Sequence, residues 1–135
     1  MKSVKLILLS AVFAMFSFTY GTFKTAIAWK STELVLGDIP QNIPVKIEFD
    51  FTNTGDAPLL ITNVQAGCGC TSVEFAKTPV KPGATSQITA IFNAAAKGAF
   101  KKTVTVTSNA EETNRVLIFS GTVIEATPRP SGVLN

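Results

Sequence analysis

Hydrophobic and polar residues alternate in short runs along most of the chain after residue 30. Within residues 45–51 the alternation is strict, and its apolar positions are Val45, Ile47, Phe49 and Phe51. Successive side chains of a strand point to opposite faces, so this period of two predicts a strand with one buried face. Similar runs predict about seven strands, at residues 33–37, 45–51, 59–64, 71–76, 86–92, 100–107 and 116–124.

Two of the connections between these runs have the residues of tight turns. Asn53, Gly55 and Asp56 follow one predicted strand, and these residue types tolerate or stabilise turn conformations. Pro82 followed by Gly83 fits the two central positions of a type II turn. We interpret both turns as structural. Short strands with turns at roughly 8–12-residue spacing predict an all-β, immunoglobulin-like antiparallel β-sandwich.

The first residues have the pattern of a secretory signal. Lys2 and Lys5 precede an uncharged, mostly apolar run from Leu6 to Gly21, and Ala26–Ala28 forms a small-residue cleavage motif. The pattern predicts cleavage after Ala28 and therefore a secreted protein, periplasmic or extracellular. The alternative is a retained N-terminal anchor, but the apolar run is shorter than the roughly 20 residues of a membrane helix.

Cleavage there defines the expected domain organisation. Residues 1–28 would be the signal peptide, residues 29–125 one sandwich domain, and the Pro- and Gly-containing residues 126–135 a flexible tail. After cleavage we expect no stable membrane span.

The basic charge of the chain belongs to the predicted leader. When Lys2, Lys5 and Lys24 leave with it, the 12 Lys and Arg fall to 9, which equals the 9 Asp and Glu. Nucleic-acid binding needs clustered positive charge, so we expect no nucleic-acid partner. The chain also has no histidine, which excludes Ser–His or Cys–His nucleophiles and histidine-bound metals.

Candidate chemistry is confined to two cysteines two residues apart. Cys68 and Cys70 are flanked by Gly67, Gly69 and Thr71, which would shape their loop. A disulfide between them is one interpretation, because Gly69 lets the chain bend to close the small ring. Such a ring would contribute only about 1.6 kcal/mol of loop entropy. A fixed loop shape or redox exchange therefore explains the bond better than a stapling role.

Three other interpretations stay open. Disulfide exchange needs a thiol of lowered pKa, and the nearest downstream cations in the sequence are Lys77 and Lys81. Cu(I) binding by the two sulfurs is chemically suitable, whereas zinc would need further ligands such as Glu74. In the last interpretation the cysteines only shape a loop of a non-catalytic module that binds an unknown protein or envelope polymer. We expect no cofactor and make no firm enzyme assignment.

Several segments together resemble a known family. They are residues 49–59, residues 61–64, the Cys-Gly-Cys-Thr segment 68–71, Pro82-Gly83, and residues 98–106. In this order they resemble the secreted family called domain of unknown function 1573, over roughly residues 31 to 124. They also resemble the wider set of immunoglobulin-like modules related to major sperm protein and the Hydin repeats.

The resemblance implies an immunoglobulin-like sandwich and a bacterial envelope or extracellular setting, without an established activity. Members often carry serine where this chain has Gly67, and this departure predicts a more flexible cysteine loop.

Overall fold

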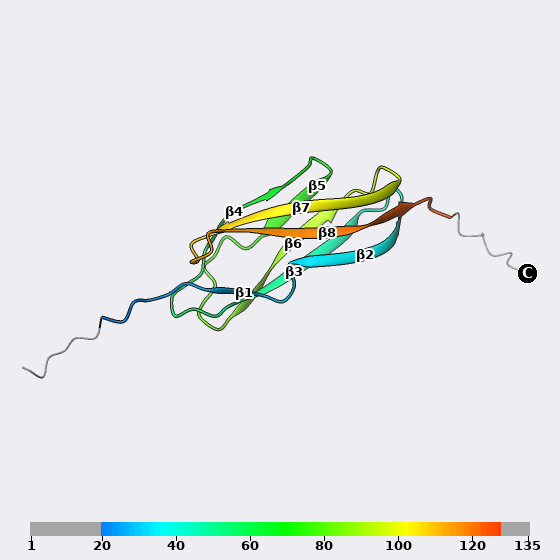
Figure 1. Ribbon diagram of the computed structural model, residues 1–135. Coiled ribbons are helices and arrows are strands. Elements are labelled where there is room, and N and C mark those ends of the chain that lie inside the picture. The colour runs from blue at the N-terminus through cyan, green and yellow to red at the C-terminus, as the bar shows by residue number, and fades with distance from the viewer. Residues whose placement is uncertain (1–19, 128–135) are drawn as a thin grey trace, which may run out of the picture.

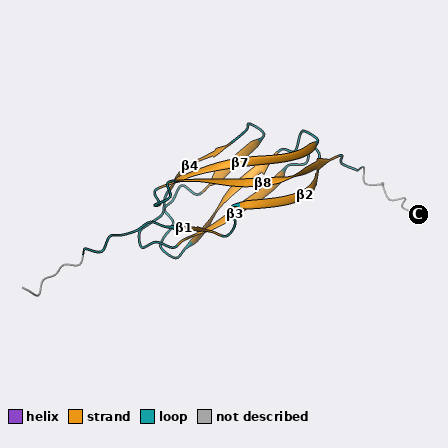
Figure 2. Ribbon diagram, viewed as in Figure 1, coloured by secondary structure: helices purple, strands orange, loops and turns teal. Residues whose placement is uncertain are grey.

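The computed structural model of the protein describes residues 20–127. Within this range all regular elements are β-strands, packed as two layers (Figure 1, Figure 2). The strands are β1 (Ile27–Trp29), β2 (Glu33–Pro40), β3 (Val45–Asn53), β4 (Ile61–Ala66), β5 (Thr71–Phe75), β6 (Thr85–Phe92), β7 (Gly98–Ser108) and β8 (Asn114–Ile124).

The strands form two four-stranded sheets. Sheet A has the order β1-β3-β6-β5, and sheet B has the order β2-β8-β7-β4. This architecture confirms the immunoglobulin-like β-sandwich predicted from the alternation. The first part of the chain contributes to both layers, because β1 lies at the edge of sheet A and β2 at the edge of sheet B.

Two features differ from the expected strand pattern. Strand β1 was not predicted, and it pairs with β3 so that Trp29 lies opposite Phe51. Strand β2 runs parallel to β8, whereas all the other pairs between these strands are antiparallel as predicted. Alternation reports which face of a strand is buried but not which strand lies beside it, so the parallel pair left no signal in the sequence.

The core lies between the sheets and is made by the inward positions of the alternating runs. On β3, Ile47, Phe49 and Phe51 are at most 2 % exposed. Burying side chains of this size contributes about 1.5–3 kcal/mol each. The other fully enclosed side chains of the core are Leu59, Ile88, Ala90, Ala94, Val104, Leu117 and Phe119.

An aromatic cluster closes one region of this core. The ring of Phe92 lies 4.7 Å from that of Phe100 and 5.7 Å from that of Phe119, measured between centroids. The three rings come from β6, β7 and β8, so they join the two sheets. Two of them, Phe92 and Phe100, also line a hollow beside the cysteine loop.

Asn53 connects two loops, β3–β4 and β5–β6, from a fully buried position. Its side-chain nitrogen donates hydrogen bonds of 2.9 Å to the carbonyl oxygens of Ala57 and Val80. Its side-chain oxygen accepts one of 2.9 Å from the Gly55 amide, and its carbonyl accepts one of 2.7 Å from the Gly83 amide. The residue is 0 % exposed, so this network satisfies a polar group that water cannot reach.

Pro82 and Gly83 form the tight turn before β6. The Ala84 amide donates to the Lys81 carbonyl over 3.0 Å, which closes a four-residue turn. Gly83 has a φ of 79°, the positive value that position i+2 of a type II turn requires.

The ends of the chain lie only partly within the described range. Residues 1–19 of the predicted leader and residues 128–135 of the predicted tail fall outside it. Among the residues that are described, no helix has the length and apolar character needed to cross a membrane.

Candidate functional site

The cysteine loop is one of the connections that cross between the two sheets. Residues 67–70 leave the end of β4, an edge of sheet B, and enter β5, an edge of sheet A. The loop is tied to both layers, because the Gly67 amide donates to the Thr103 carbonyl over 2.9 Å and the Asn93 amide donates to the Cys70 carbonyl over 3.0 Å. The loop is therefore held by β7 on one side and by the end of β6 on the other.

The two glycines of the loop have different steric roles. A Cβ atom at Gly67 would lie 2.6 Å from the hydroxyl oxygen of Thr103, so a larger residue there would displace this exposed side chain of β7. A Cβ atom at Gly69 would meet no atom within 4 Å, and the φ of Gly69 lies outside the left-handed region. The sequence predicted that Gly69 is needed for the bend and that Gly67 adds flexibility. In the structure it is Gly67 that packs closely on β7, and its amide is bonded there.

The two sulfur atoms lie at bonding distance, as in a disulfide, and the Cα atoms are 5.3 Å apart. That separation is shorter than the roughly 6.5–7 Å of residues i and i+2 on an extended strand, because the chain turns between them. The Thr71 hydroxyl lies 3.8 Å from the Cys68 sulfur and 3.9 Å from the Cys70 sulfur. Thr71 itself is buried, so its hydroxyl is a fixed weak hydrogen-bonding partner beside the pair.

A hollow of about 320 Å³ lies beside Cys70. Its walls come from the end of β6, the loop that follows it and the first half of β7. Three lysines line it, namely Lys97, Lys101 and Lys102. The sequence did not indicate that the fold places these lysines next to a cysteine.

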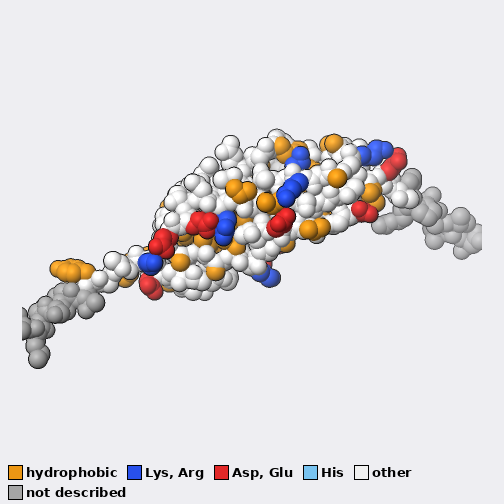
Figure 3. Space-filling model, viewed as in Figure 1, with side chains coloured by type: hydrophobic (Ala, Val, Ile, Leu, Met, Phe, Trp, Pro, Cys, Tyr) orange, Lys and Arg blue, Asp and Glu red, His pale blue; other side chains and the backbone are white. Residues whose placement is uncertain are grey.

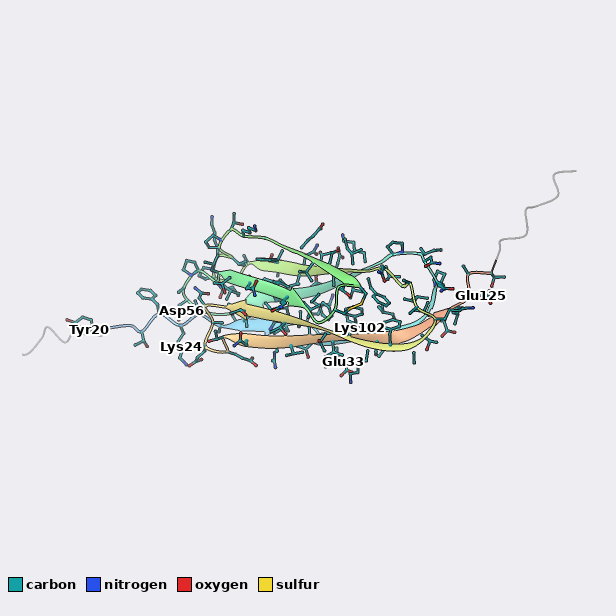
Figure 4. All side chains as sticks on the ribbon, turned by 90° about the horizontal axis from the view of Figure 1, so that it is seen from above. Tyr20, Lys24, Glu33, Asp56, Lys102 and Glu125 are labelled. Atoms are coloured by element: carbon teal, nitrogen blue, oxygen red, sulfur yellow. A yellow bond between two sulfur atoms is a disulfide. The ribbon has the colours of Figure 1, made fainter. Side chains whose placement is uncertain are left out.

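Lys102 differs from the other two lysines in its position and pairing. The Lys97 ammonium lies 3.5 Å from Glu125 and the Lys101 ammonium 3.7 Å from Glu33. Lys102 pairs with no carboxylate among the described residues, and it shares the inward phase of β7 with Phe100 and Val104. Figure 4 shows it well inside the length of the sandwich, away from Lys24 and Glu125 near the two ends.

The predicted cations are not the ones that the fold brings to the cysteine hollow. Lys77 and Lys81 lie in the connection between β5 and β6 and do not line that hollow. The signal that could have identified Lys102 is its phase, because it occupies an inward position of an alternating run. Strand β7 begins at Gly98, so Lys102 lies within the strand rather than near its start.

The outer face of sheet A carries a charged pair. Lys46 and Glu48 are two residues apart on β3, and their charged groups are 2.6 Å apart. The hydrogen bond to Glu48 raises the pKa of Lys46, and the same bond, with the positive charge, lowers the pKa of the Glu48 carboxyl. Both side chains are well exposed, so the pair ranks as a surface feature.

The outer face of sheet B carries an aliphatic stripe, by which we mean Val35, Val116, Ile118 and Ile124. Val35 is 78 % exposed, Val116 47 % and Ile124 43 %, while Ile118 is half-buried. Figure 3 shows hydrophobic side chains on the face where Figure 1 places β8 and β2, with charged side chains among them. Exposed apolar patches of this kind mark interaction surfaces when they are contiguous.

Metal chemistry has few donors in the described part of the chain. No group of three or more Cys, Asp or Glu side chains there could hold an ion. The two sulfurs would therefore be the whole donor set for Cu(I), and a four-ligand zinc site lacks its remaining ligands.

Comparison with known proteins gives one family and a common fold. Residues 27–123 match the family described as "Protein of unknown function (DUF1573)". No curated protein matches the chain.

Among solved structures, a protein of unknown function from Porphyromonas gingivalis W83 superposes with a TM-score of 0.65 at 15 % identity, over 79 % of this chain and 51 % of that chain. The present chain therefore spans about half the length of that protein. PapD-like domain 7 of human CEP192 superposes with a TM-score of 0.63 at 9 % identity, over 77 % of this chain and 89 % of that one. At these identities the similarity establishes the fold alone.

Proposed function

The chain belongs to the DUF1573 family of proteins of unknown function, and we propose that it acts as a non-catalytic binding module of the bacterial envelope. The envelope location is supported by the signal-like first residues and is part of the proposal. The partner that we propose is a protein with a complementary apolar surface.

The aliphatic stripe on sheet B is the observation that carries this proposal. It occupies the outward positions of β8 and β2, where a solvated strand would have polar residues. Val35 lies beside Ser120 in the strand register, and Ser120 lies beside Lys101 on β7. Glu33 lies beside Ile118, so the Lys101–Glu33 ion pair reaches across β8 within the stripe, where it can orient a partner without adding much affinity.

The experiment compares two variants of the full chain in its native bacterium. In the stripe variant, Val35→Gln and Val116→Gln replace two exposed aliphatic side chains. In the matched control, Ser72→Gln and Thr85→Gln introduce the same residue at two exposed polar positions on sheet A. After cross-linking, we expect the stripe variant to recover one partner protein in an amount at least about tenfold lower than the unchanged protein does. The control should recover that partner in full.

Equal recovery of that partner by both variants, with unchanged circular dichroism, would contradict the proposal. A third variant with Cys68→Ser and Cys70→Ser separates this function from thiol chemistry. A binding module keeps its partner in that variant, because the cysteine loop joins β4 to β5 and contributes no residue to the stripe.

Disulfide exchange is a second candidate, favoured by the hollow that Cys70 shares with Lys102. In this reaction a thiolate of a dithiol protein attacks the Cys68 sulfur, the bond to Cys70 breaks, and its electron pair stays on the Cys70 sulfur. The second thiolate of the partner then attacks the mixed disulfide. The partner is oxidised by two electrons and the Cys68–Cys70 pair is reduced.

A nearby ammonium group would favour the Cys70 thiolate that this reaction releases. Replacement of Lys102 by Met should therefore make the reduction potential of the pair more negative. Lys81→Met is the matched control, since Lys81 is exposed in the connection between β5 and β6 and does not line the hollow. An unchanged potential in Lys102→Met would remove the specific support for this candidate.

A further inference from the structure

The residues just before and within β1 are built into the sandwich. The Lys24 carbonyl accepts a hydrogen bond of 2.8 Å from the Asp56 amide, and the Ala26 carbonyl accepts one of 3.0 Å from the Thr54 amide. These bonds extend the β1–β3 pairing past the end of β3 and into the turn that follows it. The predicted leader thus overlaps a segment that the fold uses.

The same segment also contacts the other sheet. The Thr25 hydroxyl donates to the Asn109 carbonyl over 2.7 Å, and the Thr25 carbonyl accepts from the Glu111 amide over 3.2 Å. The Lys24 ammonium lies 3.2 Å from the Glu111 carboxylate. Residues 24 and 25 therefore join the turn after β3 to the turn between β7 and β8 at one end of the molecule.

Gly55, in the turn after β3, lies directly against the backbone of this segment. A Cβ atom at Gly55 would overlap the Lys24 carbonyl oxygen and lie 2.6 Å from the Ala26 nitrogen. No side chain fits there while residues 24–26 are in place, so the glycine in this turn has a packing reason that depends on the segment. Further along, the Trp29 ring packs on Phe51 with centroids 5.1 Å apart.

The family match also indicates that β1 belongs to the folded domain. It begins at Ile27, the first residue of β1, and so includes two residues that a cut after Ala28 would remove. Such a cut would leave Trp29 as the first residue, without Ile27 and Ala28 and without the hydrogen bonds of residues 24–26.

We propose that the leader is cut between Gly21 and Thr22, upstream of this segment. A cleavage site needs small residues one and three positions before the cut, and Gly21 and Thr19 meet that need. The apolar region then spans residues 6–18, within the roughly 7–15 residues that signals use. Lys24 no longer interrupts the leader, because it belongs to the folded domain.

Gly21 and Thr22, which this bond joins, are exposed. A Cβ atom at Gly21 would meet nothing within 4 Å, and Phe23 is 82 % exposed. The hydrogen bonds described above begin at Lys24. A cut after Gly21 thus removes none of the contacts described above. The inference rests on the proposed envelope location, since that location requires an export signal.

The test is the N-terminal sequence and intact mass of the full chain exported by a Gram-negative bacterium. We expect the recovered protein to begin at Thr22. Gly21→Leu should block processing and leave the precursor, because a large residue occupies the position before the cut. Ala28→Leu is the matched control and should be processed normally, since Ala28 is exposed on β1.

A chain that begins at Trp29, or at any residue after Lys24, would overturn the inference, as would a block by Ala28→Leu instead of Gly21→Leu. Recovery of the intact chain beginning at Met1 would also overturn it. Failure of the binding proposal gives a different result, because loss of stripe-dependent capture leaves the N-terminus at Thr22.

Discussion

At the scale of single residues, buried polar groups and closely packed glycines contribute more to the fold than the cysteines do. Asn53 bonds polar groups of two loops from a buried position, and Gly67 allows the cysteine loop to pack closely on Thr103. Cys68 and Cys70 span a ring too small to contribute much to stability. The residues that define the fold and the residues with reactive chemistry are therefore different sets.

Asn53→Ala should lower the free energy of unfolding by about 1–3 kcal/mol, because the Ala57 carbonyl and the Gly55 amide would lose their side-chain partner. The Val80 carbonyl would keep only the bond from the Leu59 amide. Urea denaturation followed by circular dichroism measures the loss. Asn109→Ala is the control, since Asn109 makes two similar hydrogen bonds from an exposed position. Equal losses in the two variants would show that burial is not the deciding factor.

The Glu48 carboxyl should titrate below the usual range of a glutamate, because the Lys46 hydrogen bond lowers its pKa. The contribution of the Lys46–Glu48 pair to the free energy of unfolding is fully present above the ordinary glutamate pKa. It disappears as the pH falls through the lowered pKa of Glu48. Titration of the side-chain carbon signal by NMR measures it. In Lys46→Met the Glu48 pKa should rise; no change in that variant would mean that another group causes the shift.

At the scale of elements, alternation and register carry different information. The strict alternation of residues 45–51 predicted β3 and its buried face from the sequence, because period two has a direct physical meaning. Strand β1 was not predicted, because it has only three residues and two of them, Ile27 and Ala28, lie within the cleavage motif of residues 26–28. The hollow beside Cys70 could not be predicted, since it depends on which strands become neighbours.

Gly121→Ala should lower the free energy of unfolding by about 1–3 kcal/mol through overpacking. A Cβ atom there would lie 2.6 Å from the Gly37 carbonyl oxygen and 3.0 Å from the Phe100 ring. Gly69→Ala is the matched control and should change stability by less than about 0.5 kcal/mol, because its Cβ would meet nothing within 4 Å. Urea unfolding midpoints of both variants test this, and a neutral Gly121→Ala would contradict the close packing of β8 on β2.

At the scale of the whole molecule, one core and two sheets make the cysteine loop dispensable for folding. The largest buried side chains come from β3, β6, β7, β8 and, with Leu59, the connection before β4, while Cys70 is only partly buried at the edge of this core. The crossing loop joins two edge strands, so its loss affects the periphery of both layers.

The double substitution Cys68→Ser and Cys70→Ser should therefore keep the circular dichroism spectrum and cost no more than about 1.6 kcal/mol of stability. Thermal unfolding of the oxidised protein and the variant provides the comparison, with the chemically reduced protein as a control for the serine side chains. A much larger loss of stability in both the variant and the reduced protein would mean that the bond is needed to stabilise the fold.

The parallel pairing of β2 with β8 has a mechanical consequence. The described chain enters at one end of the sandwich and leaves at the other (Figure 1), so tension along it pulls β2 and β8 in opposite directions along their length. Their hydrogen bonds then bear the load together instead of opening one at a time. We expect resistance to stretching to reside in this pair, and single-molecule pulling that opens the domain at negligible force would refute it. A module linked in series between two anchored structures could carry tension without unfolding.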